Sequence, residues 1–258
     1  MHVGSMLFTL VDPERGHEVA YNRWYERDHY YSGCMIGPYL LAGSRWVSTR
    51  ALKDMRLSDG SGEVTNPIER GSYVSIYWVE AGHHHDHFDW ARTQVVKLYK
   101  EGRGFTQRIH AHTILADQPR VVYRDKDPVP LTVALDHRFA GLVSVALDRN
   151  EGVTEDDLIA WLDTEALPNL LEGSTIACAS SWKPEPRTGD VPMDLGTTPG
   201  TEARQLQVMF VDDRPETAWD DIVAYSEAIA GSGLATMRWA SPFIPTIIGT
   251  DTYTDELW

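Results

Sequence analysis

Basic residues are scarce in this 258-residue chain, in which 23 Lys and Arg stand against 38 Asp and Glu and leave a formal net charge of −15 at pH 7. Nucleic acids and anionic membrane surfaces are bound through basic patches, so we expect neither as a partner. Long apolar runs are missing too. A membrane-spanning helix needs roughly 18 consecutive apolar residues, and no stretch of this kind occurs, so we expect no transmembrane segment.

Cysteine is equally sparse, with Cys34 and Cys178 as the two examples. They form neither a disulfide framework nor a metal-binding spacing, and the first residues do not resemble a secretion signal. We therefore expect reduced thiols in a cytoplasmic protein. The sequence also lacks a glycine-rich phosphate loop and a nucleophile elbow, so nucleotide-dependent and triad chemistry have no support.

Apolar residues make up 42% of the chain, which is enough for one large or two modest hydrophobic cores. A repeat favours two. When Trp24 is aligned with Trp161, the acids that follow it also align, and further pairs follow in the same order. These pairs are Glu26 with Asp163, Asp28 with Glu165, Trp46 with Trp182, Trp90 with Trp219 and Arg108 with Arg238. We infer an internal duplication.

Hydrophobic periodicity predicts the order strand, helix, strand, strand, helix, strand in each half. In the first half the strands are expected at 6–11, 39–47, 73–80 and 107–115, and the helices at 17–30 and 83–99. In the second half the strands are expected at 141–147, 174–182, 204–211 and 235–244, and the helices at 154–167 and 215–230. Long loops are expected at 50–71 and 183–201, and a shorter one at 32–38.

This order is that of a ferredoxin-like unit, in which two helices cover one face of an antiparallel sheet and leave the other face bare. We predict an α+β protein with an N-terminal unit at 1–118, a linker at 119–139 and a C-terminal unit at 140–258. Two bare sheet faces can bury each other. We expect a cavity between the sheets to be the ligand site, with the second unit as scaffold and cavity wall.

The stretch Trp24-Tyr25-Glu26-Arg27-Asp28-His29, followed by a loop and a strand that ends in Arg45-Trp46, resembles the EthD-like branch of the dimeric α/β barrel superfamily. The resemblance implies two ferredoxin-like units in tandem, packed sheet to sheet, and leaves open a further homodimer. Members include cofactor-independent monooxygenases, muconolactone-type isomerases, polyketide cyclases and haem proteins. The fold therefore restricts the chemistry only weakly.

Histidines of the first half are the main catalytic candidates. His29 lies at the predicted end of the first helix, where it could be a general acid or base or could cap the helix. His110 and His112 are two apart on a predicted strand, so we expect both to share one face with Arg108 and to line the cavity, although a satisfied structural network is the alternative. The matching positions in the second half, Ala166, Ala240 and Pro242, carry no imidazole.

Other polar and aromatic residues complete the predicted site. Arg108 and Tyr77 could stabilise developing negative charge, although the counterpart Arg238 favours for Arg108 a structural ion pair shared by both halves. Four further residues are candidates for substrate binding, with ordinary packing as the alternative for the first two: Tyr30, Tyr31, Ser75 and Trp78.

The run His83-His84-His85-Asp86-His87 suggests a metal site, because His83 and His87 are one helical turn apart. Consecutive histidines at a helix start more often form a solvated face, so we expect no metal. Haem is also not expected. Haem proteins of the superfamily with tandem units take the iron on a histidine of the second unit, and here all ten histidines lie at or before His137.

Together these patterns predict an enzyme without a cofactor that transfers protons on an apolar, aromatic or polyketide-like small molecule, as an isomerase, cyclase or lyase. A cofactor-independent monooxygenase of a phenol is one alternative. A noncatalytic small-molecule-binding protein is the other.

Overall fold

The computed structural model describes residues 1–185 and 202–258, so most of the predicted loop at 183–201 lies outside the described residues. The strands are β1 Val3–Pro13, β2 Leu40–Val47, β3 Leu57–Ser58, β4 Tyr73–Glu80, β5 Arg108–Tyr123, β6 Gly141–Arg149, β7 Ile176–Pro184, β8 Arg204–Val211 and β9 Ala235–Pro245. The helices are α1 Glu18–Trp24, α2 Arg50–Lys53, α3 His84–Lys100, α4 Glu155–Trp161, α5 Leu167–Leu171 and α6 Trp219–Ser232. Shorter turns are π-helical at Tyr25–Met35 and Leu162–Ala166 and 3₁₀ at Leu131–Val133 and Pro215–Ala218.

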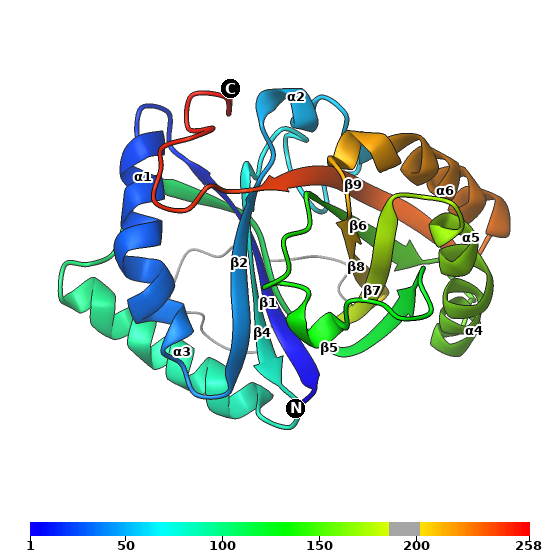
Figure 1. Ribbon diagram of the computed structural model, residues 1–258, viewed down its shortest axis with the longest axis horizontal. Coiled ribbons are helices and arrows are strands. Elements are labelled where there is room, and N and C mark those ends of the chain that lie inside the picture. The colour runs from blue at the N-terminus through cyan, green and yellow to red at the C-terminus, as the bar shows by residue number, and fades with distance from the viewer. Residues whose placement is uncertain (186–201) are drawn as a thin grey trace.

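The strands of both halves form one antiparallel sheet in the order β2-β4-β1-β5-β7-β8-β6-β9-β3. The sheet closes into a barrel because β2 also pairs with β9, through Trp46 with Pro245 and Val47 with Ile244. Helices α1 and α3 lie outside one half of this barrel and α4 to α6 lie outside the other half (Figure 1). The predicted α+β fold of two tandem ferredoxin-like units is therefore confirmed, with the two sheets joined along both edges.

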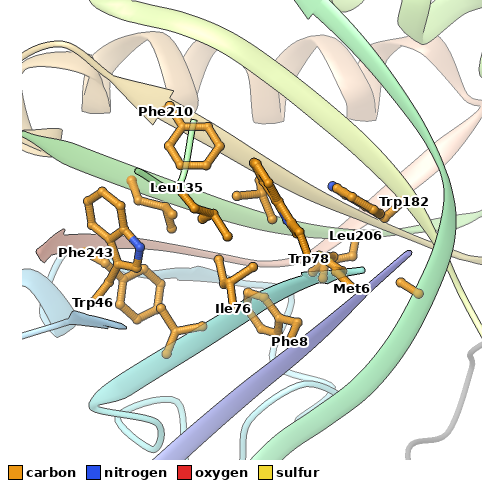
Figure 2. Packing of buried hydrophobic residues seen from close by; sticks show 14 of the residues in the cluster. Met6, Phe8, Trp46, Ile76, Trp78, Leu135, Trp182, Leu206, Phe210 and Phe243 are labelled. Atoms are coloured by element: carbon orange, nitrogen blue, oxygen red, sulfur yellow. The ribbon is translucent and has the colours of Figure 1, made fainter. Parts of the chain in front are cut away.

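The barrel interior is a packed hydrophobic core. Alternate residues of the strands, such as Phe8, Trp78 and Phe210, point inward and are fully buried. Figure 2 shows these side chains pointing into the space between the two halves of the sheet, where the ring of Trp78 lies 5.9 Å from that of Phe210 and 6.2 Å from that of Trp182. The prediction of a ligand cavity between the sheets is therefore wrong, because large apolar side chains fill that space.

The segment predicted as a linker contributes to the barrel. Strand β5 continues through it to Tyr123 and pairs with β7 from Ala116 to Tyr123. After the strand, Leu131, Leu135 and Phe139 are buried in the same hydrophobic cluster as the barrel interior. These apolar residues stabilise the barrel through burial, at roughly 25 cal/mol per Å² of apolar surface. The unit boundaries at 118 and 140 stay predictions.

The first helix is longer and less regular than its sequence pattern predicts. It begins as α1 and continues as a π-helical segment from Tyr25 to Met35, which we call the π segment. Most of the predicted loop at 32–38 is therefore helical. The predicted loop at 50–71 also contains structure, since it holds α2 and the short strand β3 that pairs with β9. The π-helical turns matter because such turns are frequent at functional sites.

Each described helix is too short, or too polar, to cross a lipid bilayer.

Candidate functional site

A cavity of about 310 Å³ lies between the outer face of the first sheet and the helices that cover it. Strands β1, β4 and β5 form its floor, and the π segment and α3 form its walls. Its lining is mostly apolar and includes Leu7, Val11, Phe88, Ala91 and Val95. Polar side chains lie on the floor and the π segment, namely Thr9, Tyr25, His29, Cys34, Tyr77, Arg108, His110 and Thr113, and others lie on the α3 side, namely His84, His85, His87, Asp89, Arg92 and Glu185. Such a concave, largely apolar space with a few polar groups is the usual form of a small-molecule site.

Strand alternation explains why these residues face the helices. On β1 the inward residues Phe8 and Leu10 belong to the barrel core, so Thr9 between them faces outward. Thr9 is hydrogen-bonded to Thr113 of β5, with 2.7 Å between the hydroxyl oxygens, and Thr113 is 3.1 Å from Nδ1 of His110. These pairings fix His110 on the cavity floor.

A β-bulge separates the two histidines of β5. His112 pairs with Leu10 and His110 pairs with Val11, so Ala111 has no partner in the ladder. The extra residue reverses the alternation, and His112 joins the inward face while His110 stays on the outward face. The prediction that His110 and His112 share a face is therefore wrong. His112 is buried and does not line the cavity.

His29 lies on the π segment and stacks on the indole of Trp24 at a centroid distance of 4.5 Å. Gly33 makes room for its ring, because a Cβ at that position would lie 2.8 Å from Nδ1 of His29. Burial, together with the positive charge of Arg108, lowers the pKa of His29 from 6.5 to about 3. The imidazole is therefore neutral at physiological pH, so it can form hydrogen bonds but is a poor general acid.

Arg108 places a positive charge at the cavity. Its guanidinium donates a hydrogen bond of 2.9 Å to the Tyr99 hydroxyl and lies over the Trp24 ring, 5.0 Å from the centroid. No ion pair joins it to a carboxylate among residues 1–185 and 202–258. The predicted counterpart Arg238 differs, since it lies at the bulge of β9 and contacts Asp148 at 2.8 Å. The prediction of an ion pair shared by both halves is therefore wrong for Arg108.

Three neutral donors lie together where the π segment meets strand β4. The hydroxyls of Tyr25 and Tyr77 are 2.7 Å apart, and the Cys34 thiol is hydrogen-bonded to Tyr77. Desolvation raises the pKa of all three groups, to about 11 for Cys34 and well above the usual tyrosine value for Tyr77. They therefore keep their protons and can donate hydrogen bonds to a ligand oxygen.

The histidines at the start of α3 contact different partners. His83 stacks on Tyr39 at 3.6 Å and its Nδ1 lies 3.0 Å from Asp86, whereas Nδ1 of His87 lies 2.8 Å from the Pro38 carbonyl oxygen. The part of the chain that the structure describes contains no group of three or more His, Cys, Asp or Glu side chains that could hold a metal ion. His84, His85 and His87 nevertheless line the cavity wall.

The four predicted substrate-binding residues do not line this cavity. Trp78 points into the barrel, and Ser75 is buried next to Tyr25. Tyr30 donates its hydroxyl to the Gly43 carbonyl at 2.5 Å, and Tyr31 is 52% exposed. Of the predicted catalytic residues, the structure brings together His29, Arg108, Tyr77 and His110.

Sequence reasoning missed Tyr25, Cys34, Thr9 and Thr113. Thr9 had a signal, because it is a polar residue within an apolar strand. Cys34 had none, because the sequence gives no indication that the π segment extends beyond Tyr31.

The fold is shared with several solved structures at low sequence identity. An anthrone oxidase-like protein matches with a TM-score of 0.54 and 10% identity over 97% of this chain and 95% of its own. A protein assigned as a chlorite dismutase matches with a TM-score of 0.57 and 11% identity over the full length of both chains. The fold is that of the dimeric α/β barrels. A scan against protein-family models and a search of curated proteins both gave no match.

A DypB variant from Rhodococcus jostii in complex with haem also matches, with a TM-score of 0.51 and 9% identity over 100% of this chain and 97% of its own. A haem in the second unit does not fit the residues present here. The cavity of about 240 Å³ beside α6 is lined without His, Cys or Met, and its Tyr225 donates its hydroxyl to Gln207.

Proposed function

We propose that this protein is an enzyme that transfers a proton on an apolar, aromatic or polyketide-like small molecule bound in the cavity between the first sheet and its helices. The observation that carries the proposal is the convergence of Arg108, Tyr77 and His110 from two strands onto one mostly apolar cavity. Such groups, placed in a partly desolvated space, can remove a proton and stabilise the anion that results.

Each residue has a separate role. His110 takes the proton from an acidic C–H group of the substrate and can return it to another atom of the same molecule. Arg108 supplies positive charge for the enolate or phenolate, and Tyr77 supplies a hydrogen-bond donor. His29, which is neutral, accepts or donates a hydrogen bond rather than serving as an acid. Returning the proton to a different carbon gives isomerisation, and loss of a leaving group gives elimination.

The experiment measures hydrogen–deuterium exchange at the acidic methylene of anthrone in D₂O by NMR, with and without the protein. His110→Ala should lower the catalysed exchange rate roughly 100-fold or more, because it removes the base. The matched control is His112→Ala on the same strand, whose side chain faces the barrel. Equal exchange rates for wild type and His110→Ala, at matched folded fractions, would reject the assigned base.

A second candidate is cofactor-independent oxygenation of an electron-rich phenol or enol. The similarity in fold to the anthrone oxidase-like protein favours it, as does the positive charge of Arg108 beside neutral donors, which would stabilise a substrate anion that reacts with O₂. Oxygen consumption with anthrone distinguishes the two reactions. Exchange without oxygen uptake supports proton transfer alone, and coupled uptake supports oxygenation.

Noncatalytic binding remains the alternative from a different class. It predicts that anthrone quenches the fluorescence of Trp24, which contacts both His29 and Arg108, without exchange or oxidation. The difference in quenching between wild type and Trp24→Phe isolates the signal of this one indole.

We further propose that the two units descend from one module and that the chain belongs to the EthD-like branch. Two shared irregularities support the duplication. Each first helix continues into a π-helical turn, at Tyr25–Met35 and Leu162–Ala166, and each last strand has a bulge, at Ala111 and Arg238. Aligning the bulges rather than the arginines pairs His110 with Met237.

A further inference from the structure

Arg108 differs from the other charged side chains that line the cavity among the described residues. At the α3 side, Asp89 is 3.6 Å from Arg92, and Glu185 is 3.0 Å from Nε2 of His84, so each carboxylate lies next to a basic side chain. Arg108 remains as a positive charge without a carboxylate partner.

Three other arginines of the described residues are buried, and two of them pair with carboxylates. The third, Arg56, donates instead to three backbone carbonyls and the Ser241 hydroxyl, and burial lowers its pKa to about 9. Arg45 is paired with Glu26 at 3.1 Å, and Arg204 is paired with Asp148 at 2.8 Å. A cation held away from bulk water without a counter-ion is costly, and these two pairs avoid that cost. Arg108 is partly buried against Trp24 and Tyr99 with no such partner among the described residues.

Four of the remaining titratable groups of the cavity are neutral. His29 is unprotonated, and Tyr25, Tyr77 and Cys34 keep their protons, because burial disfavours the charged form of each. His110, His85 and His87 complete the titratable lining, and the α3 pair and Glu185 are accounted for above. A cationic ligand would be repelled by Arg108. A neutral ligand would leave Arg108 without a counter-ion.

We propose that the cavity binds its ligand as a monoanion, an ionised phenol or enol, with Arg108 as the counter-ion. The inference rests on the proposed function in that it concerns the same cavity, and it adds the ligand's charge state before any reaction. The apolar lining from Leu7, Val11, Phe88 and Val95 fits a flat, delocalised anion, whose negative charge is weakly hydrated. The anion would accept hydrogen bonds from Arg108 and from the Tyr77 hydroxyl.

The test uses 4-nitrophenol, because its anion absorbs visible light and its acid does not. At a pH where the free probe is mostly protonated, wild-type protein should increase the anion band until it saturates. Arg108→Gln should weaken the apparent affinity for the probe roughly tenfold or more, as expected for loss of a charge-assisted hydrogen bond. The matched control, Arg214→Gln, removes an exposed arginine of the second unit and should leave the band unchanged.

A comparison within the wild type does not depend on the folding of any variant. Equilibrium dialysis should show tighter binding of 4-nitrophenol than of 4-nitroanisole, which has nearly the same shape but cannot ionise. Equal binding of the two probes, or binding without growth of the anion band, would overturn the inference and leave the cavity as a small-molecule site. If neither probe binds, the proposed function loses its site as well.

Discussion

Stability below neutral pH should depend on His29. Its pKa in the folded protein is about 3, against 6.5 for an ordinary imidazole. Between these two values the unfolded chain binds a proton at this position and the folded chain does not. The free energy of unfolding should therefore fall as the pH falls from about 6.5 towards about 3, and the contribution of His29 should be constant above that window.

The magnitude follows from the linkage relation. At about pH 4.5 the unfolded imidazole is two units below its pKa, and each unit is worth roughly 1.4 kcal/mol, so His29 should lower the stability of the wild type by roughly 2.5 kcal/mol relative to about pH 7.5. The value changes little if the folded pKa is 4 rather than 3, because both lie below the pH of the measurement. The carboxylates whose pKa is lowered, such as Asp59 and Asp251, stay ionised there.

The assay is urea unfolding followed by circular dichroism at the two pH values, for wild type and for His29→Gln, which cannot titrate. Subtracting the change in unfolding free energy of His29→Gln from that of the wild type cancels the contribution of His87, whose pKa is also lowered by burial. The wild type should lose roughly 2.5 kcal/mol more than His29→Gln. The exposed His137→Gln variant should behave like the wild type. Parallel pH dependence of wild type and His29→Gln would show that the imidazole is not held neutral, and the assigned role would fail.

Three further substitutions test the packing around the site. Gly33→Ala should displace the His29 ring, cost roughly 1 to 3 kcal/mol of stability and weaken 4-nitrophenol binding in dialysis, since the new Cβ would lie 2.8 Å from Nδ1. Glu26→Gln should cost roughly 3 to 5 kcal/mol in urea unfolding, because it leaves the buried Arg45 without its counter-ion; a change below 1 kcal/mol would contradict the pairing. Leu257→Ala should cost roughly 2 to 5 kcal/mol in the same assay, because this side chain is fully buried, whereas the exposed Ile248→Ala should cost little.

Much of the fold could be predicted because the strands follow a regular alternation. The predicted strands at 73–80 and 204–211 coincide with β4 and β8, where alternate residues such as Val74 and Ile76 face the barrel core. The closure of the barrel could not be predicted from this alternation. It depends on edge pairing between Trp46 and Pro245, which are far apart in the sequence and carry no local signal.

The site was predicted in part, and its errors share one physical cause. The residues that share one face of a regular strand can be predicted from the sequence. A β-bulge, however, moves every residue that follows it to the opposite face. The bulge at Ala111 separates His110 from His112, and nothing in the run Arg108-Ile109-His110-Ala111-His112 indicates it. The face of the sheet that meets the ligand cavity was also predicted wrongly. The helices leave a cavity above His110 on the outer face, whereas side chains fill the barrel interior on the inner face.

The most direct test of the central claim is a crystal structure of the protein with bound 4-nitrophenol. The cavity is outside the barrel, so the ring should lie between β5 and the π segment, with its oxygen near Arg108 and Tyr77. A probe bound inside the barrel, next to Trp78 and Trp182, would contradict the account.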